Sequence, residues 1–390
     1  MSDKEGNTGV RKRLLNRKLF LYRYMCTLLL IIFITPSICL SSTNNTLFPS
    51  LNRPLTLKWK FHSYKNGSPL IADSDTLFLP STDGSINALE AESGKLLWRS
   101  DVGGKIKLQI VGANPKTLYV LTEQKVRRST SNIDQTIGVI HALSEETGIT
   151  RWRQSLPSAL LGLTALTEGS IFCATIDNHI YSINRHTGDI LWGTEELSSP
   201  SISVWSNKDT VLTATTDGHI YLFAIETGQR ISDYRTHKTF ISAISSLNRI
   251  IYFGSSDGYV NAMSVNAGIS QTLWRRRVGT GARTISLSER GLVVTSADNF
   301  AYLLSFKNGR TRWKRLLPGR VLGEPVITSE GILFALAGDN VCVAISIGNG
   351  QRINTISVGE DNVVVAEPAI ANGVIVIPTR IGLFAFAPTS

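Results

Sequence analysis

Cysteine is scarce in this sequence. The 390 residues include four, Cys26, Cys39, Cys173 and Cys342, and no two of them are adjacent. Cys26 and Cys39 fall in an N-terminal basic and apolar segment, while Cys173 and Cys342 fall in separate apolar runs. We interpret Cys173 and Cys342 as small buried residues rather than as a disulfide pair. The sequence therefore gives no indication of a disulfide scaffold or of a cysteine-based metal site.

Groups suited to catalysis are also sparse. The six histidines show no paired metal-ligand spacing, and most aspartates that recur with the chain's period stand before glycine or asparagine, as turn residues do. Each short glycine motif is explained by a turn, so no phosphate-binding loop is indicated. We therefore predict no catalytic residue, no metal and no cofactor. The histidines are His62, His141, His179, His186, His219 and His237.

Long hydrophobic runs are missing as well. The apolar run at residues 25–34 has ten residues, whereas a transmembrane helix needs about 20. It follows seven Lys or Arg in residues 1–24 and precedes a small-residue stretch, the order of a secretory signal. An uncleaved anchor, or lipidation of Cys39 despite the preceding Ile38, are the alternatives. We predict a signal peptide or membrane anchor at 1–40, a flexible Ser/Thr/Asn/Pro-rich tether at 41–54, and export to the periplasm or a membrane face toward it.

The positive charge divides into two equal parts. The formal net charge is +10, of which residues 1–24 supply +5, so the rest of the chain carries only +5. This excess gives no support for nucleic-acid binding. Charged residues are 18% and hydrophobic residues 42% of the chain, which is typical of a globular protein with a large core.

A repeat of about 40 residues fills the chain from residue 55 onward. Each copy has a turn, a short strand, a second turn ending in glycine, and a further strand that often carries a tryptophan. The copies align on a small or aliphatic residue at the centre of the first strand: Ala88, Ala142, Ser182, Leu222, Ala262, Leu303, Ala344 and Ala385. This period, made of strands and turns, predicts an all-β, eight-bladed β-propeller of four-stranded antiparallel blades over residues 55–390.

Two sets of residues recur in most copies of the repeat, a tryptophan and a turn glycine. Most tryptophans stand four residues after the turn glycine, and the fourth and seventh copies have Ser232 and Asn354 instead. The structural tryptophans are Trp59, Trp98, Trp152, Trp192, Trp274 and Trp313. The turn glycines are Gly94, Gly148, Gly188, Gly228, Gly268, Gly309 and Gly350.

The run Ile86–Trp98 resembles the tryptophan-docking repeat of the quinoprotein-type (PQQ-like) eight-bladed propellers. That family includes quinone-dependent dehydrogenases and the non-enzymatic BamB proteins of outer-membrane β-barrel assembly, so one repeat serves both an enzyme and a scaffold. The dehydrogenases use adjacent cysteines and a calcium site of Glu, Asn and Asp. This sequence has no Cys-Cys pair, and no such calcium cluster can be assigned in it.

The resemblance therefore implies a non-catalytic, monomeric scaffold that binds proteins of the bacterial envelope, with BamB-like assembly as its role. The alternative is a propeller that binds a quinone or another ligand in its channel, as a quinoprotein dehydrogenase-like enzyme or an extracellular sensor. One departure concerns the BamB contact with its barrel partner, to which an arginine-bearing loop and acidic residues are assigned. The matching connections here, residues 195–200 and 233–238, have no arginine in the first and one acid in the second.

The second copy contains an insertion, roughly Gln124 to Thr136, with the cations Lys125, Arg127 and Arg128. Insertions at this place emerge on one rim of a propeller, often the binding rim, so we predict these three residues as partner contacts. A tolerated surface loop is the alternative. Outer strands also carry cation clusters, at 275–277 and 310–315. These protect exposed sheet edges or face an anionic partner.

The eighth copy is incomplete. Its third strand ends near Ala387, while residues 55–61 read as a fourth strand without a blade. We therefore predict that Leu55–Phe61 pairs with the strand around Phe384 and closes the ring.

Overall fold

The computed structural model describes residues 48–62, 70–81, 83–113, 116–127, 134–236, 240–247, 249–266 and 269–389. All regular elements in these ranges are strands, and no helix there is long and apolar enough to cross a membrane. The predicted signal or anchor at 1–40, most of the predicted tether, Arg128 and Gly268 lie outside the described residues.

The first four blades use the strands in chain order. Blade one contains β2 (Ile71–Asp73), β3 (Thr76–Pro80), β4 (Ser85–Glu90) and β5 (Leu96–Asp101). Blade two contains β6 (Lys105–Ala113), β7 (Lys116–Arg127), β8 (Asp134–Ser144) and β9 (Thr150–Ser155). Blade three contains β10 (Leu160–Leu166), β11 (Ser170–Thr175), β12 (Ile180–Asn184) and β13 (Ile190–Gly193). Blade four contains β14 (Ser201–Ser206), β15 (Thr210–Thr215), β16 (His219–Ala224) and β17 (Arg230–Arg235).

The remaining blades continue the order until the last. Blade five contains β18 (Phe240–Leu247), β19 (Ile250–Ser255), β20 (Tyr259–Asn266) and β21 (Ile269–Arg277). Blade six contains β22 (Ala282–Ser288), β23 (Gly291–Ser296), β24 (Phe300–Leu304) and β25 (Thr311–Leu316). Blade seven contains β26 (Val326–Ile327), β27 (Gly331–Ala335), β28 (Val341–Ser346) and β29 (Arg352–Ser357). Blade eight contains β30 (Ala369–Ala371), β31 (Val374–Thr379), β32 (Gly382–Pro388) and β1 (Leu55–Phe61).

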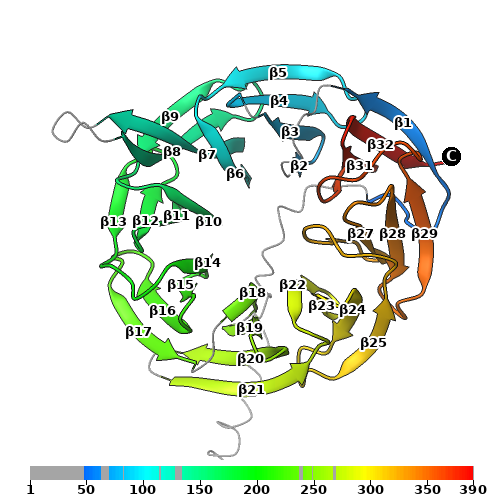
Figure 1. Cartoon of the computed structure of the whole chain (residues 1–390). Helices are drawn as coiled ribbons and strands as arrows, with labels where there is room; N and C mark the ends of the chain where they lie inside the picture. The colour runs from blue at the N-terminus through cyan, green and yellow to red at the C-terminus, as the bar shows by residue number, and fades with distance from the viewer. Residues whose placement is uncertain are drawn as a thin grey trace, which may run out of the picture. The chain divides into compact units, whose positions relative to one another are not determined.

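The eight antiparallel sheets stand side by side in a ring (Figure 1), which confirms the predicted eight-bladed propeller. The first strand of each blade lies toward the centre and the fourth on the circumference. Hydrophobic cores lie between neighbouring blades. One example joins Phe78 and Ala88 of blade one to Leu118 and Val120 of blade two. Each blade therefore buries its two faces against its neighbours.

The alignment residues share one place in the sheets. Each lies in the third strand, directly opposite the tryptophan position of the fourth strand, as Ala88 lies opposite Trp98. The same pairing joins Ala142 to Trp152, Ser182 to Trp192, Leu222 to Ser232, Ala262 to Trp274, Leu303 to Trp313, Ala344 to Asn354 and Ala385 to Trp59. A small or slim aliphatic residue here leaves room for the large partner on the neighbouring strand.

Each of the six structural tryptophans of the repeat contacts the next blade. Trp98 places its ring against Gly148, where a Cβ would meet ring carbons at 2.4 Å, and its Nε1 donates to the carbonyl of Glu145 at 2.9 Å. Gly148 has a φ of +69°, which glycine adopts without strain. The other docking pairs are Trp59–Gly94, Trp152–Gly188, Trp192–Gly228, Trp274–Gly309 and Trp313–Gly350.

Blade eight joins the two ends of the described chain, as predicted. β1 pairs with β32 in antiparallel register from Leu55 opposite Pro388 to Phe61 opposite Leu383. Trp59 and Phe61 pack on a core that spans blades eight and one. The N-terminal strand therefore closes the ring and covers the edge of β32.

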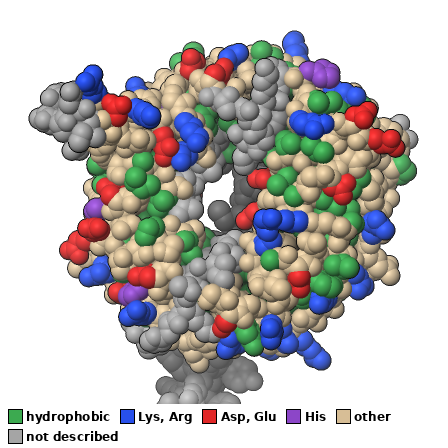
Figure 2. All heavy atoms as spheres, viewed as in Figure 1, with side chains coloured by type: hydrophobic (Ala, Val, Ile, Leu, Met, Phe, Trp, Pro, Cys, Tyr) green, Lys and Arg blue, Asp and Glu red, His purple; other side chains and the backbone are tan. Residues whose placement is uncertain are grey.

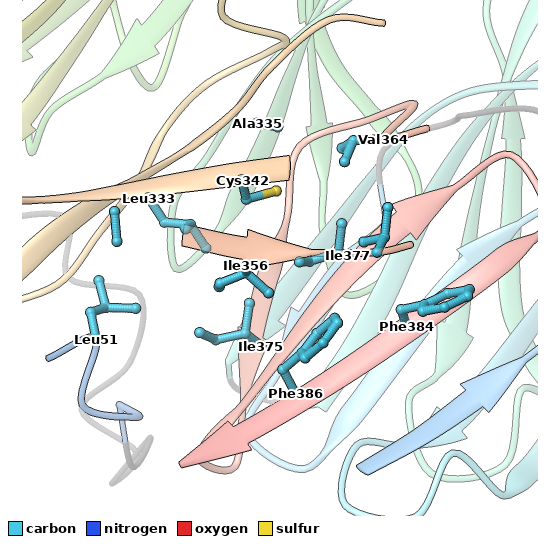
Figure 3. Packing of buried hydrophobic residues seen from close by; sticks show 12 residues of the cluster. Leu51, Leu333, Ala335, Cys342, Ile356, Val364, Ile375, Ile377, Phe384 and Phe386 are labelled. Carbon is cyan, nitrogen blue, oxygen red and sulfur yellow. The ribbon is translucent and has the colours of Figure 1, made fainter. Parts of the chain in front are cut away.

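The docked chain begins earlier than the sequence indicates. The predicted tether included residues 48–54, but Leu51 is fully buried in a cluster with Ile375 and Phe386 (Figure 3). Asn354 donates its side-chain amide to the carbonyls of Leu51 at 3.2 Å and Arg53 at 2.8 Å. Asn354 stands at the tryptophan position of blade seven, where the next blade offers a chain segment in place of a turn glycine. The tether boundary at residue 54 is therefore wrong for the part that the structure describes.

Candidate protein-binding surface

The insertion of blade two is a strand extension rather than a loop. β7 and β8 remain paired from Thr117 opposite Ser144 out to Arg127 opposite Asp134, so the described part of the predicted insertion is a regular hairpin. The inner neighbour β6 reaches only to Glu123, and the outer neighbour β9 only to Val139. The pairs beyond Glu123 therefore form a two-stranded ribbon that extends past the rest of the blade (Figure 1).

The base of this hairpin is anchored to its blade. Gln135 donates its side-chain amide to the carbonyl of Pro157 at 2.9 Å, and Arg153 donates to the Oε1 of Gln124. Lys107 pairs with Glu123 at 3.1 Å. These contacts fix the direction in which the ribbon leaves the ring, so it is a preformed feature.

The ribbon presents a cationic and partly apolar tip. Lys125 and Arg127 are exposed, and the Val126 side chain between them is 41% exposed. Beyond the ends of β6 and β9, neither edge of the ribbon is paired within its own sheet. Such edges can accept an additional strand, while the cations favour an acidic partner. The structure thus brings Lys125 and Arg127 together, and Arg128 follows outside the described residues.

The rim that carries the ribbon also carries two repeat histidines. The Nδ1 of His219 lies 2.7 Å from the Oδ1 of Asp233, and its ring stacks on Tyr221 with centroids 5.6 Å apart. His179 stacks in the same way on Tyr181 at 6.1 Å. Both histidines follow the turn between the second and third strands, the same turn that is extended in blade two. They mark this rim as polar, with His219 hydrogen-bonded to Asp233 and the Nδ1 of His179 without a hydrogen-bond partner among the described residues.

Two buried charges were missed by the sequence reasoning. The residue three places before the turn glycine is apolar in most copies, for example Ala91, Val265 and Ile347, but it is Glu145 in blade two and Arg185 in blade three. Both are only 5% exposed. Comparison of this position between the copies would have identified them, because charge is rare at an otherwise buried repeat position.

Arg185 makes two side-chain hydrogen bonds, and its Nη2 has no hydrogen-bond partner among the described residues. Arg185 donates from Nε to the hydroxyl of Tyr119 at 3.2 Å and from Nη1 to the carbonyl of Thr167 at 2.9 Å. The Oε2 of Glu145 has no hydrogen-bond partner among the described residues, and Lys116 stays 3.9 Å from Oε1. Burial, with the Asp73 carboxylate adding to it and Lys116 opposing, raises the pKa of Glu145 to about 7.

Glu145→Gln should therefore stabilise the protein at high pH. Folding raises the pKa of Glu145. Its contribution to the stability of the folded protein is therefore fully present below the ordinary carboxyl pKa and is lost as pH rises through about 7. At pH 8 the variant should gain about 1–3 kcal/mol in free energy of unfolding, and near pH 4.5 almost nothing. Denaturant unfolding at both pH values measures this. Glu146→Gln, at the exposed neighbouring carboxylate, should change neither value, and an equal effect of the two variants would refute the assignment.

Cysteine and metal chemistry have little support in the described chain. Cys173 and Cys342 are free and buried, and burial raises the pKa of the Cys342 thiol to about 12 and that of Cys173 further still. No group of three or more His, Cys, Asp or Glu that could hold a metal ion occurs among the described residues.

Comparisons with known proteins agree on one family. A family model described as outer membrane protein assembly factor BamB matches residues 82–270 and 256–390. The chain is similar to the outer membrane protein assembly factor BamB of Yersinia pestis, with 23% identity covering 80% of this chain and 82% of the relative. It is also similar to the outer membrane protein assembly factor BamB of Alteromonas naphthalenivorans, with 24% identity covering 84% of this chain and 83% of the relative.

Solved structures share the fold. The crystal structure of BamB from Moraxella catarrhalis matches with a TM-score of 0.65 at 15% identity, covering 86% of this chain and all of that one. The computationally designed Ika8 protein matches with a TM-score of 0.69 at 14% identity, with the same coverage. A natural and a designed chain therefore share this architecture, so these two likenesses support the fold alone.

Proposed function

Because the chain belongs to the family described as outer membrane protein assembly factor BamB, we propose that it is a non-catalytic, protein-binding scaffold of the bacterial cell envelope that acts in outer-membrane protein assembly. The observation that carries this proposal is the extent of the family match, which runs from residue 82, just before β4 of blade one, to the end of β32 in blade eight. The proposed location is the periplasmic side of a membrane. The basic and apolar order of residues 1–40 supports it.

The proposed binding element is the β7–β8 ribbon. It is anchored at its base, carries two exposed cations in its described part, and extends beyond the ends of its neighbouring strands β6 and β9. A partner with an acidic exposed strand fits this surface, through main-chain hydrogen bonds along the edge and charge contacts at the tip.

Capture from the native envelope tests the function. The full chain with a C-terminal affinity tag is cross-linked in its own host, purified from the envelope fraction, and its partners are identified by mass spectrometry. We expect enrichment of a protein of the outer-membrane β-barrel assembly apparatus over a tagged unrelated periplasmic protein. Recovery of the chain from the cytosol with Met1 intact, or with no envelope partner, would sink the proposal.

Charge reversal at the ribbon should weaken this capture. The triple variant Lys125→Glu, Arg127→Glu, Arg128→Glu removes the attraction that steers an acidic partner, and the loss should be about tenfold at low salt and smaller at high salt. Salt-dependent binding of the partner identified above measures it. The matched control reverses three exposed cations in turns of the opposite rim, Lys208, Arg290 and Lys307. Unchanged capture by the ribbon variant at every ionic strength would show that the insertion is only tolerated.

A further inference from the structure

Charge is divided between the circumference of the propeller and the rest of it. The eight outermost strands, β1, β5, β9, β13, β17, β21, β25 and β29, contain 14 Lys and Arg against two Asp, a net of +12. Residues 48–390 as a whole contain 33 Lys and Arg against 28 Asp and Glu, so the remaining parts are at −7. Figure 2 shows Lys and Arg side chains around the lower and right margins, where β21 and β25 lie.

The cations are densest on blades five and six. β21 and β25 contain six Lys and Arg and no acid. Several are held in place: Arg276 donates to the carbonyl of Gly309 at 2.8 Å, and the Nζ of Lys314 lies 3.7 Å from the ring centroid of Phe300. Protection of sheet edges does not require this density, because the outermost strand β13 contains no Lys or Arg at all. The wall made by β21 and β25 is therefore more cationic than its place in the fold demands.

Large apolar side chains stand among these cations. Leu316 is 66% exposed and Leu273 is 43% exposed. The combination of cations with exposed leucines on an outer wall is typical of surfaces that lie on lipid headgroups. An acidic protein partner would instead favour a shaped pocket around a few anchoring residues.

The described N-terminal chain docks on blades seven and eight. Ser50 and Asn52 both donate to the Oε2 of Glu330 in blade seven, at 3.0 and 3.4 Å, and Phe48 is 55% exposed. Blade seven is the direct neighbour of blade six. Residues 41–47 are all that separate Phe48 from the predicted anchor, a reach of at most about 25 Å. This short segment joins the predicted anchor to the chain that docks on blades seven and eight.

We propose that the outer wall of blades five and six, formed by β21 and β25, docks on the anionic lipid headgroups of the membrane to which the chain is attached. This inference rests on the proposed envelope location but not on the partner or the ribbon. Contact on this wall leaves the ribbon of blade two, three to four blades away around the ring, free for protein binding.

Vesicle binding tests the proposal. Residues 41–390 form a compact unit with all eight blades complete, so the chain from Ser41 onward is used to exclude effects of the N-terminal segment. Binding is measured by co-sedimentation with phosphatidylglycerol–phosphatidylcholine vesicles and with phosphatidylcholine vesicles. The variant Arg312→Glu, Lys314→Glu should weaken binding to the anionic vesicles about 10- to 100-fold.

The matched control is Arg151→Glu, Arg153→Glu in β9. These residues flank Trp152 as Arg312 and Lys314 flank Trp313, but on the opposite side of the ring (Figure 1). The control should lose about threefold or less, since it changes only the distant charge. Equal losses in both variants, or no preference of the parent for anionic vesicles, overturn the proposal. If the charge-reversal variant has a lower melting temperature than the parent, the neutral variant Arg312→Gln, Lys314→Gln is used in its place. Unaltered partner capture by the Arg312→Glu, Lys314→Glu variant separates this surface from the proposed scaffold function.

Discussion

Deletion of residues 48–62 should lower the melting temperature by about 10 °C or more. The deletion removes β1, the docking tryptophan Trp59 and the fully buried Leu51. Loss of a half-buried docking tryptophan and a fully buried leucine costs about 5–10 kcal/mol together. In a protein of this size each kcal/mol is roughly 1–2 °C. The uncovered edge of β32 should also promote aggregation.

The measurement is the melting temperature of the parent, the two deletion variants and Leu51→Ala, by scanning calorimetry or a dye-based assay. The control deletion of residues 41–47, which precedes the docked segment, should shift the melting temperature by about 1 °C or less, because the sequence predicts a tether there. Leu51→Ala alone should give an intermediate loss of about 2–5 kcal/mol. Equal melting temperatures for the two deletions would mean that the ring is closed without β1.

Gly148→Ala should be among the most damaging single substitutions in the propeller. Two costs combine at this position: a φ of +69°, and ring carbons of Trp98 within 2.4–2.9 Å of the added Cβ. The left-handed backbone costs about 1 kcal/mol for alanine. Displacement of a docked tryptophan costs about 3 kcal/mol more. We therefore expect a loss of roughly 4 kcal/mol in free energy of unfolding.

Two other glycines separate these costs. Gly338 has a φ of +73° with nothing within 4 Å of an added Cβ, so Gly338→Ala should lose about 1 kcal/mol from the backbone alone. Gly169 has the same open space without a positive φ, so Gly169→Ala should change stability by about 0.5 kcal/mol or less. Denaturant midpoints of the three variants should fall in that order. A Gly148 variant no worse than the Gly338 variant would refute the docking role of Trp98.

The repeated features could be predicted from the sequence because each is present several times. A single Asp-Gly turn or a single tryptophan is weak, but eight copies in register fix the strand order and the place of each tryptophan. The closing role of Leu55–Phe61 followed from the same reasoning, since it resembles a fourth strand whose blade is otherwise missing. These elements depend on local turn chemistry and alternation, which a sequence displays directly.

Features that occur once were not predictable in the same way. Leu51 stands between polar residues, Ser50 and Asn52, without a repeat pattern around it, and only the tertiary fit against Ile375 and Phe386 shows that it is buried. The insertion at residues 124–136 could be located by its length, but its pairing as a ribbon depends on cross-strand register rather than composition. Glu145 belongs to a repeat position, yet its burial becomes apparent only when the apolar residues in the other copies are known to be inside.

The shared blade also sets the order of folding. Pro54 accepts a hydrogen bond from Thr389, a partner 335 residues later in the chain. β1 is thus the first strand of the propeller to be synthesised, and its partner β32 is the last. Blades one to seven can form as their strands emerge, because each is made of consecutive segments. Closure must wait for the final strand and bridge nearly the whole chain, which makes it the slow, high-contact-order step. Until then β1 has no partner strand, and its exposed edge is a site at which a chaperone can bind.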